Sequence, residues 1–212
     1  KTNCIRSSFY HRDSGTSERI ERVEEDMVNG AFSRADFTPQ GRPAIFVDRD
    51  GTIVDDLPQG RLDVAADELR GPASQLLLEA KKNGIPVFLV TNQPAIAKGR
   101  ISESDVYRVH NRIQELLVSS IGECFDEIVF CPHHPESGHE GEIAHLKTEC
   151  MCRKPRAGML YDLAKRHNLD LVKSLVVGDS QADHLLAKNV GASFIIDSKI
   201  QDIDLAEWLA HL

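Results

Sequence analysis

Short runs of apolar residues alternate along the chain with longer segments in which apolar residues recur every three or four positions. The short runs predict β-strands at residues 44–47, 86–90, 127–131, 175–177 and 193–196. The longer segments predict helices at residues 72–82, 102–117, 157–167, 181–189 and 202–211. Because continuous apolar strands separated by amphipathic helices are typical of parallel sheets, we predict an α/β fold: a Rossmann-like parallel sheet with helices on both faces.

The N-terminal residues depart from this pattern. A short amphipathic helix is predicted within residues 16–30, and a turn-rich linker follows at residues 38–43. A single helix with a weak apolar face is more typical of an appendage than of a domain. We therefore predict an appendage and linker over residues 1–40 and one domain over residues 41–212.

Composition and charge exclude several classes of protein. The chain has 212 residues, of which 27% are charged and 41% hydrophobic, as in a globular protein. Its formal net charge of −8 argues against binding to nucleic-acid backbones, which favours clustered Lys and Arg. No apolar run reaches the roughly 20 residues that span a bilayer, and residues 1–10 lack the apolar stretch of a secretory signal. We expect a cytoplasmic protein that binds neither nucleic acid nor membrane.

Two aspartates follow the first predicted strand, in the segment Asp48-Arg49-Asp50-Gly51-Thr52. A carboxylate at a strand end can attack phosphorus if a cation offsets the repulsion between the two anions. A second carboxylate can protonate the leaving oxygen and later deprotonate water. Gly51 permits a sharp turn whose backbone amides can face a phosphate. The alternative is an acidic turn that only caps the strand.

Polar residues also follow later elements of the pattern. The second strand leads into Thr91-Asn92-Gln93, whose hydroxyl and amides suit a phosphoryl group. Arg153-Lys154 provides a cation for the nucleophile and a second one for another anion. The fourth strand leads into Gly178-Asp179-Ser180, where Asp179 is a natural ligand for Mg²⁺. Asp183 is either a supporting partner or a carboxylate at a helix start.

The order and spacing of these four motifs resemble the haloacid dehalogenase superfamily of phosphohydrolases over about residues 44–198. The resemblance implies that Asp48 is the nucleophile and Asp50 the general acid and base. It implies that Thr91 and Lys154 hold the phosphate. It also implies Mg²⁺ on Asp48, on the backbone carbonyl of Asp50 and on Asp179. Residues 41–212 would then be a Mg²⁺-dependent phosphatase domain without a large cap, acting through an aspartyl phosphate.

Three cysteines and a histidine are crowded into Cys131-Pro132-His133 and Cys150-Met151-Cys152. Three thiolates and one imidazole suit a tetrahedral Zn²⁺ with no open position, so we predict a structural zinc site that orders the long polar loop between them. Reduced thiols without metal are the alternative. The loop histidines His134, His139 and His145 are expected to be exposed.

The zinc loop and residues 91–99 narrow the resemblance to the D-glycero-D-manno-heptose 1,7-bisphosphate phosphatase branch, whose substrate is a small phosphorylated sugar. This implies hydrolysis of the 7-phosphate. The expected substrate-binding residues are Gly51, Thr52, Asp56, Asn92, Gln93, Arg153 and Ser180. Two features depart from the family pattern. Residues 53–63 lack a Gly-Tyr-Val segment, and Ser180 stands where a basic residue is common.

Other functions stay open at this stage. Histidinol-phosphate phosphatases share the zinc loop, nucleic-acid 3′-phosphatases have similar motifs, and a non-catalytic zinc-stapled scaffold belongs to a different class. Residues 10–30 resemble the last stretch of a sugar-phosphate nucleotidyltransferase, so an enzyme of that kind is a candidate covalent or non-covalent partner. An unrelated linker helix is the alternative. We expect a monomer.

Overall fold

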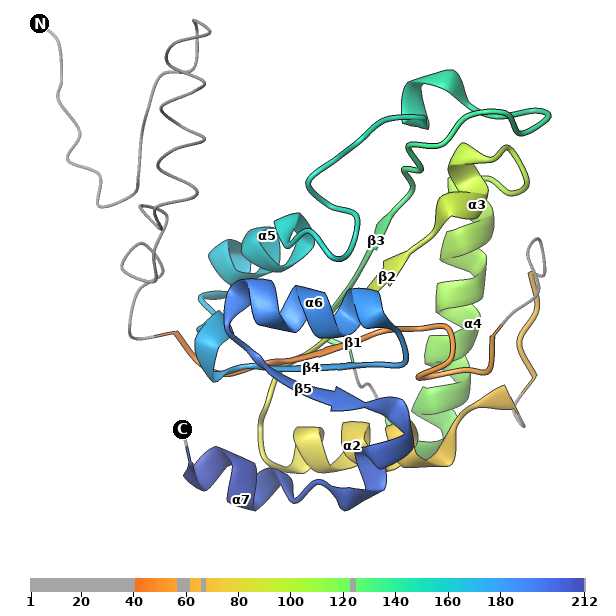
Figure 1. Ribbon diagram of the computed structural model, residues 1–212. Coiled ribbons are helices and arrows are strands. Elements are labelled where there is room, and N and C mark those ends of the chain that lie inside the picture. The colour runs from red at the N-terminus through yellow and green to blue at the C-terminus, as the bar shows by residue number, and fades with distance from the viewer. Residues whose placement is uncertain (1–40, 57–61, 66–67, 123–124, 212) are drawn as a thin grey trace, which may run out of the picture. The chain divides into compact units, whose positions relative to one another are not determined.

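The computed structural model describes residues 41–56, 62–65, 68–122 and 125–211 (Figure 1). All of them except Gly41 belong to the unit that spans Arg42–Leu212. The helix and most of the linker expected in the N-terminal appendage lie outside the described residues. The appendage and its relation to a nucleotidyltransferase therefore stay predictions.

Five parallel strands form one sheet in the order β3-β2-β1-β4-β5. Their bounds are β1 Ile45–Val47, β2 Val87–Asn92, β3 Glu127–Cys131, β4 Leu175–Gly178 and β5 Ser193–Ile196. The first strand is central, and its Val47 pairs with Leu89 of β2 and Val177 of β4. All pairings are parallel, so the strands end at the same edge. The predicted sheet is confirmed.

Helices connect the strands. Their bounds are α2 Gly71–Lys82, α3 Pro94–Ala97, α4 Glu103–Ile121, α5 Gly158–His167, α6 Gln181–Val190 and α7 Leu205–Ala210. Short 3-10 helices lie at Ala144–Leu146, Leu171–Lys173 and Asp197–Asp202. Ser102 and Ser180 begin α4 and α6 with capping boxes, each closed by an aspartate three residues later. These caps explain why both helices begin where the sequence predicts.

Helices cover both faces of the sheet, α5 and α6 on one and α2 and α7 on the other (Figure 1). Successive side chains of a strand point to opposite faces. Ile45 and Val47 therefore join a buried cluster with Leu77 of α2 and Ile113 of α4. Phe88 of β2 packs against His167 of α5, with ring centroids 4.8 Å apart. The two-sided core is the arrangement that the continuous apolar strands indicate.

Several elements differ from the prediction. Strand β2 continues to Asn92 because it pairs with β3 through Cys131, and α4 continues to Ile121. Helix α3 is too short for a periodic pattern to reveal. The predicted helix at 202–211 is shorter, since Asp204 accepts hydrogen bonds from the amides of Ala206 and Glu207 and thereby starts α7.

The connection between β1 and α2 is small. Val54 forms an antiparallel bridge with Leu69, which folds this segment back on itself. No large cap is present among the described residues. Among them, no helix combines the length and apolar character that crossing a bilayer requires. Short loops therefore border the edge where the strands end.

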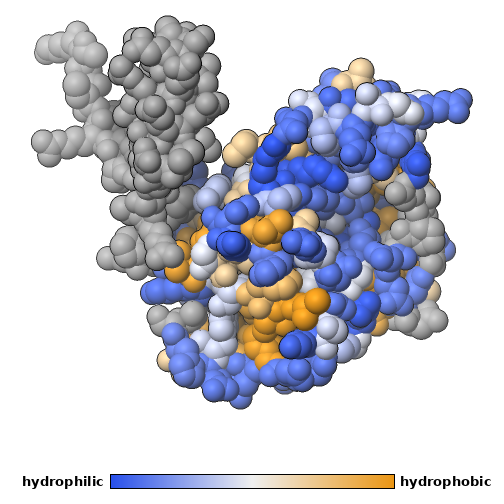
Figure 2. All heavy atoms as spheres, in the orientation of Figure 1, coloured by the Kyte–Doolittle hydropathy of each residue, from blue (hydrophilic) through white to orange (hydrophobic). Residues whose placement is uncertain are grey.

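Strand β5 lies at an edge of the sheet, and its side chains are only partly buried. Figure 2 shows apolar atoms gathered on the surface near β5 and the C-terminal segment. The residues that line a groove on this surface include Phe194, Ile196, Ile203 and Trp208.

We expect Ile113→Ala to destabilise the fold by about 2–5 kcal/mol, because Ile113 is fully buried and its removal leaves a cavity between α4 and the sheet. Val118→Ala on the same helix is the matched control. Val118 is 45% exposed, so its free energy of unfolding should change by less than about 0.5 kcal/mol. Urea unfolding of both variants measures this. Equal losses would contradict the assignment of Ile113 to the core.

Candidate active site and metal centre

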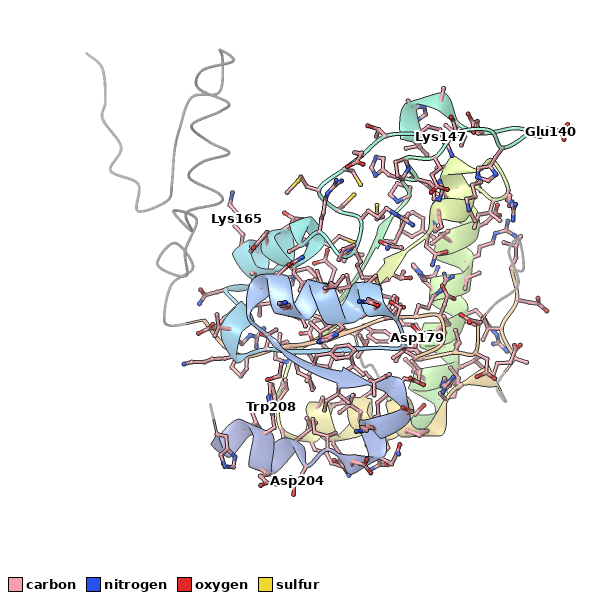
Figure 3. All side chains as sticks on the ribbon, viewed as in Figure 1. Glu140, Lys147, Lys165, Asp179, Asp204 and Trp208 are labelled. Atoms are coloured by element: carbon pink, nitrogen blue, oxygen red, sulfur yellow. The ribbon has the colours of Figure 1, made fainter. Side chains whose placement is uncertain are left out.

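The ends of the central strands bring the predicted catalytic residues together. Asp48 directly follows β1, and its amide donates a 2.9 Å hydrogen bond to the carbonyl of Val177 in β4. Thr91 lies near the end of β2, and Asp179 directly follows β4. Figure 3 shows Asp179 at the edge of the sheet where β4 ends. Residues far apart in sequence thus meet because parallel strands share one C-terminal edge.

Lys154 connects the first and last motifs. Its Nζ lies 2.7 Å from Oδ1 of Asp48 and 2.7 Å from Oδ1 of Asp183. All three side chains are nearly or fully buried. The contact with Asp183 is a hydrogen bond, whereas Oδ1 of Asp48 has no aligned donor, so that contact is an ion pair by proximity. Lys154 is therefore fixed beside the predicted nucleophile.

The charges of this cluster shift the proton affinities of its members. Burial raises the pKa of Asp48 to about 6, although the ammonium of Lys154 counteracts this. Burial alone would lower the pKa of Lys154, but the carboxylates of Asp48 and Asp183 raise it above its usual value. Burial and the neighbouring Asp183 raise the pKa of Asp179. Both aspartates thus lie where a further cation would be favourable.

The carboxylates of Asp48, Asp179 and Asp183 offer oxygens that lie within 4.8 Å of one another. One ammonium faces three carboxylates here, which formally leaves an excess of two negative charges. Carboxylate oxygens are the ligands that Mg²⁺ takes. The donor set and its uncompensated charge therefore fit a hard divalent cation.

Gly51 allows Asp179 to approach β1. Its φ is +71°, a conformation that favours glycine, and a Cβ at this position would lie 2.2 Å from Oδ2 of Asp179. Any side chain at position 51 would therefore displace a predicted metal ligand. This gives Gly51 a steric role in addition to the phosphate contact that the sequence predicts for its turn.

Asp50 points away from the carboxylate cluster. Arg49 donates to both of its oxygens, from Nε to Oδ1 and from Nη2 to Oδ2, each at 2.9 Å. Nε2 of Gln93 donates to Oδ2 at 3.0 Å and also to Oγ1 of Thr91 at 3.0 Å. The Asp50 carboxylate is thus not part of the carboxylate cluster, and the metal contact expected from its backbone carbonyl stays a prediction.

Asn92 and Ser180, both predicted to bind substrate, form hydrogen bonds within the protein. Asn92 accepts a 3.0 Å hydrogen bond from the amide of Lys154 and donates one of 3.1 Å to its carbonyl. Ser180 donates to Asp183 through Oγ at 2.5 Å. Both side chains thereby support residues that surround Asp48. Their contacts with substrate stay predictions.

The other predicted substrate-binding residues differ in exposure. Thr52 is fully buried. Asp56 is exposed, and its charge contributes to the raised pKa of Asp179. Arg153 donates from Nη1 to the carbonyl of His133 at 3.2 Å, which ties it to the cysteine-rich loop. Of these three, Asp56 and Arg153 are accessible from solvent.

Sequence analysis missed the roles of Arg49 and His110. Both are buried, and Nη1 of Arg49 lies 3.3 Å from Nε2 of His110. Burial, assisted by the charge of Arg49, lowers the pKa of His110 to about 3. His110 lies on the apolar face of a predicted helix, beside Val109 and Ile113. A polar residue at such a position is the only sequence signal that could have indicated a buried polar contact.

The predicted zinc ligands converge. Three sulfur atoms lie 3.1–3.5 Å apart, and Nδ1 of His133 lies 3.6 and 3.3 Å from Sγ of Cys131 and Cys152. A tetrahedral Zn²⁺ with ordinary bond lengths would separate such atoms by about 3.5–3.8 Å. The sulfurs are too far apart for disulfides, and all three cysteines are free. The four donors therefore fit zinc with little adjustment.

The other loop histidines do not join this cluster. His145 is exposed, as expected. The expectation was wrong for His134, which is 8% exposed because its ring packs against His139 and its Nδ1 lies 3.2 Å from the carbonyl of Glu136. His139 is only partly exposed. Figure 3 shows Glu140 and Lys147 at the far end of this loop. The loop is thus ordered internally as well as through its cysteines.

Comparisons with known proteins agree with this geometry. Residues 151–196 match the HAD-hydrolase-like family. A curated D-glycero-beta-D-manno-heptose-1,7-bisphosphate 7-phosphatase from Rhodopseudomonas palustris is 38% identical over 154 residues, which cover 71% of this chain and 80% of the relative.

Two solved structures are similar over most of their length. A HAD-like phosphatase from Mesorhizobium loti has a TM-score of 0.69 and 32% identity, with 81% of this chain and 88% of that chain covered. D,D-heptose 1,7-bisphosphate phosphatase from B. bronchiseptica, complexed with magnesium and phosphate, has a TM-score of 0.59 and 28% identity, with 76% and 86% covered.

We expect the buried His110 to make the fold sensitive to acid. Its pKa is about 3 in the folded chain and about 6.5 in an unfolded one. The unfolded state therefore binds the proton more tightly, and stability falls as the pH drops below the unfolded pKa. Between pH 7 and pH 5 this amounts to about 2 kcal/mol. His110→Gln should lose about that much of the pH dependence, as measured by urea unfolding at both values.

His184→Gln is the control for this measurement, since His184 is exposed on α6. It should keep the pH dependence of the unsubstituted protein. An unchanged pH dependence in His110→Gln would contradict a buried, neutral His110.

Proposed function

Because the chain belongs to the heptose bisphosphate 7-phosphatase family of haloacid dehalogenase-type hydrolases and is a phosphatase, we propose that it removes the 7-phosphate of D-glycero-D-manno-heptose 1,7-bisphosphate. The observation that carries this proposal is the buried contact of Lys154 with Asp48 at the edge of the sheet. It supplies a nucleophile and a fixed cation at one point. The substrate class, a phosphorylated sugar, is inferred from the family.

In the first step, the Asp48 carboxylate attacks phosphorus in line, forming an acyl phosphate while the bond from phosphorus to the sugar oxygen breaks. Asp50 gives its proton to the departing oxygen. In the second step, Asp50 takes a proton from water, whose oxygen attacks phosphorus. The bond between phosphorus and Asp48 then breaks, which releases inorganic phosphate and regenerates both aspartates.

The surrounding residues stabilise charge in both steps. Nζ of Lys154 is fixed beside Asp48 and can offset negative charge on the transferring group. The hydroxyl of Thr91 accepts from Gln93, which leaves its proton free to donate to a phosphoryl oxygen. Mg²⁺, held by Asp48, Asp179 and the carbonyl of Asp50, would supply further charge neutralisation. Asp183 fixes Lys154 from the opposite side.

We also assign Zn²⁺ to Cys131, His133, Cys150 and Cys152, as a structural ion. The support is the close approach of four donors in the described loop. Burial raises the pKa of the Cys131 thiol, so a bound cation would be needed to keep it deprotonated at neutral pH. Cys152 lies two residues before Lys154, and Arg153 between them contacts the carbonyl of His133. The zinc site would therefore hold Arg153 and Lys154 in place, with Arg153 facing the other phosphate of the sugar.

We expect phosphate release from heptose 1,7-bisphosphate in the presence of Mg²⁺ at a kcat/KM at least about tenfold above that for histidinol phosphate. The reason is that a second anion on the substrate can pair with Arg153, which histidinol phosphate does not offer. Side-by-side turnover measures this. A higher kcat/KM for histidinol phosphate, or for a 3′-phosphorylated oligonucleotide, would contradict the proposed substrate.

Asp48→Asn is the decisive variant for the mechanism, because an amide cannot form the acyl phosphate. Its kcat should fall by at least about 10⁴-fold, while its unfolding stays cooperative. Asp162→Asn, on the exposed face of α5, is the matched control and should retain full activity. Retained turnover in Asp48→Asn would rule out the aspartyl-phosphate route. The role of the metal is tested by assaying the wild-type protein without Mg²⁺, which should abolish turnover.

We expect Cys152→Ser to lose bound zinc and to lower kcat at least about tenfold, because Lys154 would no longer be held beside Asp48. Metal analysis should give about one zinc ion per chain for the unsubstituted protein. His145→Ala, in the same loop but outside the cluster, should keep both zinc and activity. Full activity in a zinc-free Cys152→Ser variant would contradict the link from zinc to Lys154.

A further inference from the structure

A buried polar network surrounds Asp50 and extends away from the phosphate site. Arg49 lies at its centre, with a side chain that is only 7% exposed. Its guanidinium donates to both oxygens of Asp50, to Oε1 of Gln93 at 2.9 Å, and faces Nε2 of His110 at 3.3 Å. Neither the nucleophile nor the carboxylate cluster accounts for this network. A buried arginine with so many partners has a defined orientation.

The protonation state of His110 follows from its partner. A guanidinium has only donors, so the Nε2 atom that faces Arg49 must be an acceptor. His110 is therefore neutral, with its proton on Nδ1. A neutral acceptor orients Arg49 without competing with Asp50 for its charge. His110 in turn is fixed by α4 and by contact with the ring of Phe130, with centroids 5.8 Å apart.

The hydrogen bonds of Asp50 leave one place for a proton. A carboxylate has about four lone-pair positions. Oδ2 accepts from Arg49 and Gln93, and Oδ1 accepts from Arg49 alone. Among the described residues no further donor meets Oδ1. The Asp50 side chain is 27% exposed, so solvent reaches part of it.

We propose that Arg49, oriented by His110 and Gln93, is a positioning residue that fixes the Asp50 carboxyl so that Oδ1 carries the transferred proton. The proposal rests on the general acid and base role proposed for Asp50. Oδ1 gives the proton to the leaving oxygen as its bond to phosphorus breaks, and later takes one from the attacking water. Arg49 keeps its own protons throughout and does not touch the substrate.

A lysine could not replace Arg49 in this role. A guanidinium binds both oxygens of a carboxylate in one plane, whereas an ammonium is a point charge that leaves the carboxylate free to rotate. Arg49→Lys therefore keeps the charge and removes the orientation. This makes it a sharper test than truncation, which would leave Asp50 and His110 unpaired in a buried site.

The test compares two phosphate esters that differ in their need for a proton. Departure of a sugar alkoxide from heptose 1,7-bisphosphate needs protonation, whereas nitrophenolate leaves p-nitrophenyl phosphate without it. Arg49→Lys should lower kcat/KM for the sugar ester about tenfold to a hundredfold, because this constant reports the steps up to departure of the sugar oxygen. Its kcat/KM for p-nitrophenyl phosphate should fall by less than about threefold, because nitrophenolate departs without the proton. Water activation follows the aspartyl phosphate in both reactions and therefore does not enter this comparison of kcat/KM.

A double-variant cycle separates action through Asp50 from a general structural effect. Adding Arg49→Lys to Asp50→Asn should cause little further loss, because the residue through which Arg49 acts is already disabled. Arg166→Lys, which alters a surface ion pair with Glu127, is the matched control and should behave as wild type with both esters. Equal losses with both esters, or additive losses in the double variant, would overturn the proposal.

His110→Phe provides a second route if Arg49→Lys folds poorly. It removes the acceptor for Nη1 and keeps a ring against Phe130. It should show the same preference for p-nitrophenyl phosphate, with a smaller loss for the sugar ester, and unchanged selectivity would overturn the role of His110 and Arg49. Failure of the proposed function is recognised separately, because Asp48→Asn would then remain active, or wild type would release phosphate from neither ester.

Discussion

The contact of one buried ammonium with two carboxylates organises the active site. Lys154 lies 2.7 Å from Asp48 and from Asp183. All three groups are buried, and a buried charge without a partner would carry a large desolvation free energy. Its position depends on three separate parts of the chain, since Asp48 follows β1, Asp183 lies in α6, and Asn92 of β2 binds the Lys154 backbone. The same cluster retains excess negative charge beside Asp179. This excess is the physical reason that the site suits a divalent cation.

The cysteine-rich loop solves a problem that this arrangement creates. Lys154 must reach the sheet edge from a segment without regular structure, between β3 and α5. Hydrogen bonds alone fix irregular backbone weakly, whereas the proposed tetrahedral ion would join the end of β3 to the residues just before Lys154. Cys131 belongs to β3, and Cys152 precedes Lys154 by two residues. The proposed zinc would thus act on catalysis by holding Lys154 in position.

Two carboxylates separated by one residue have different surroundings. Asp48 faces Lys154 and the acidic cluster, whereas Asp50 is bound by Arg49 and Gln93. The turn that contains Gly51 separates them and also admits Asp179. This division suits a nucleophile and a proton carrier. Because the described residues contain no large cap, we expect substrate selection to depend on the loops around this edge, including the long loop that carries Arg153.

The sequence by itself determined the sheet, most helices and which acidic residues, lysine and cysteines come together. Alternation of apolar runs with amphipathic segments is a local signal, as are the Ser102 and Ser180 caps. Strand ends such as Asp48 and Asp179 could be assigned to one edge because parallel strands must share it. The spacing of Cys131, His133, Cys150 and Cys152 is likewise local to two short segments.

Only the tertiary structure decided which polar atoms meet. Asn92 and Gln93 look alike in sequence, yet one binds the Lys154 backbone and the other binds Asp50. Arg49 and His110 lie 61 positions apart, and neither belongs to a pattern that would pair them. Such contacts depend on how α4 packs against β1 and β2. Hydrophobic periodicity specifies that a helix packs, but the partners of each buried polar group follow from side-chain directions after packing.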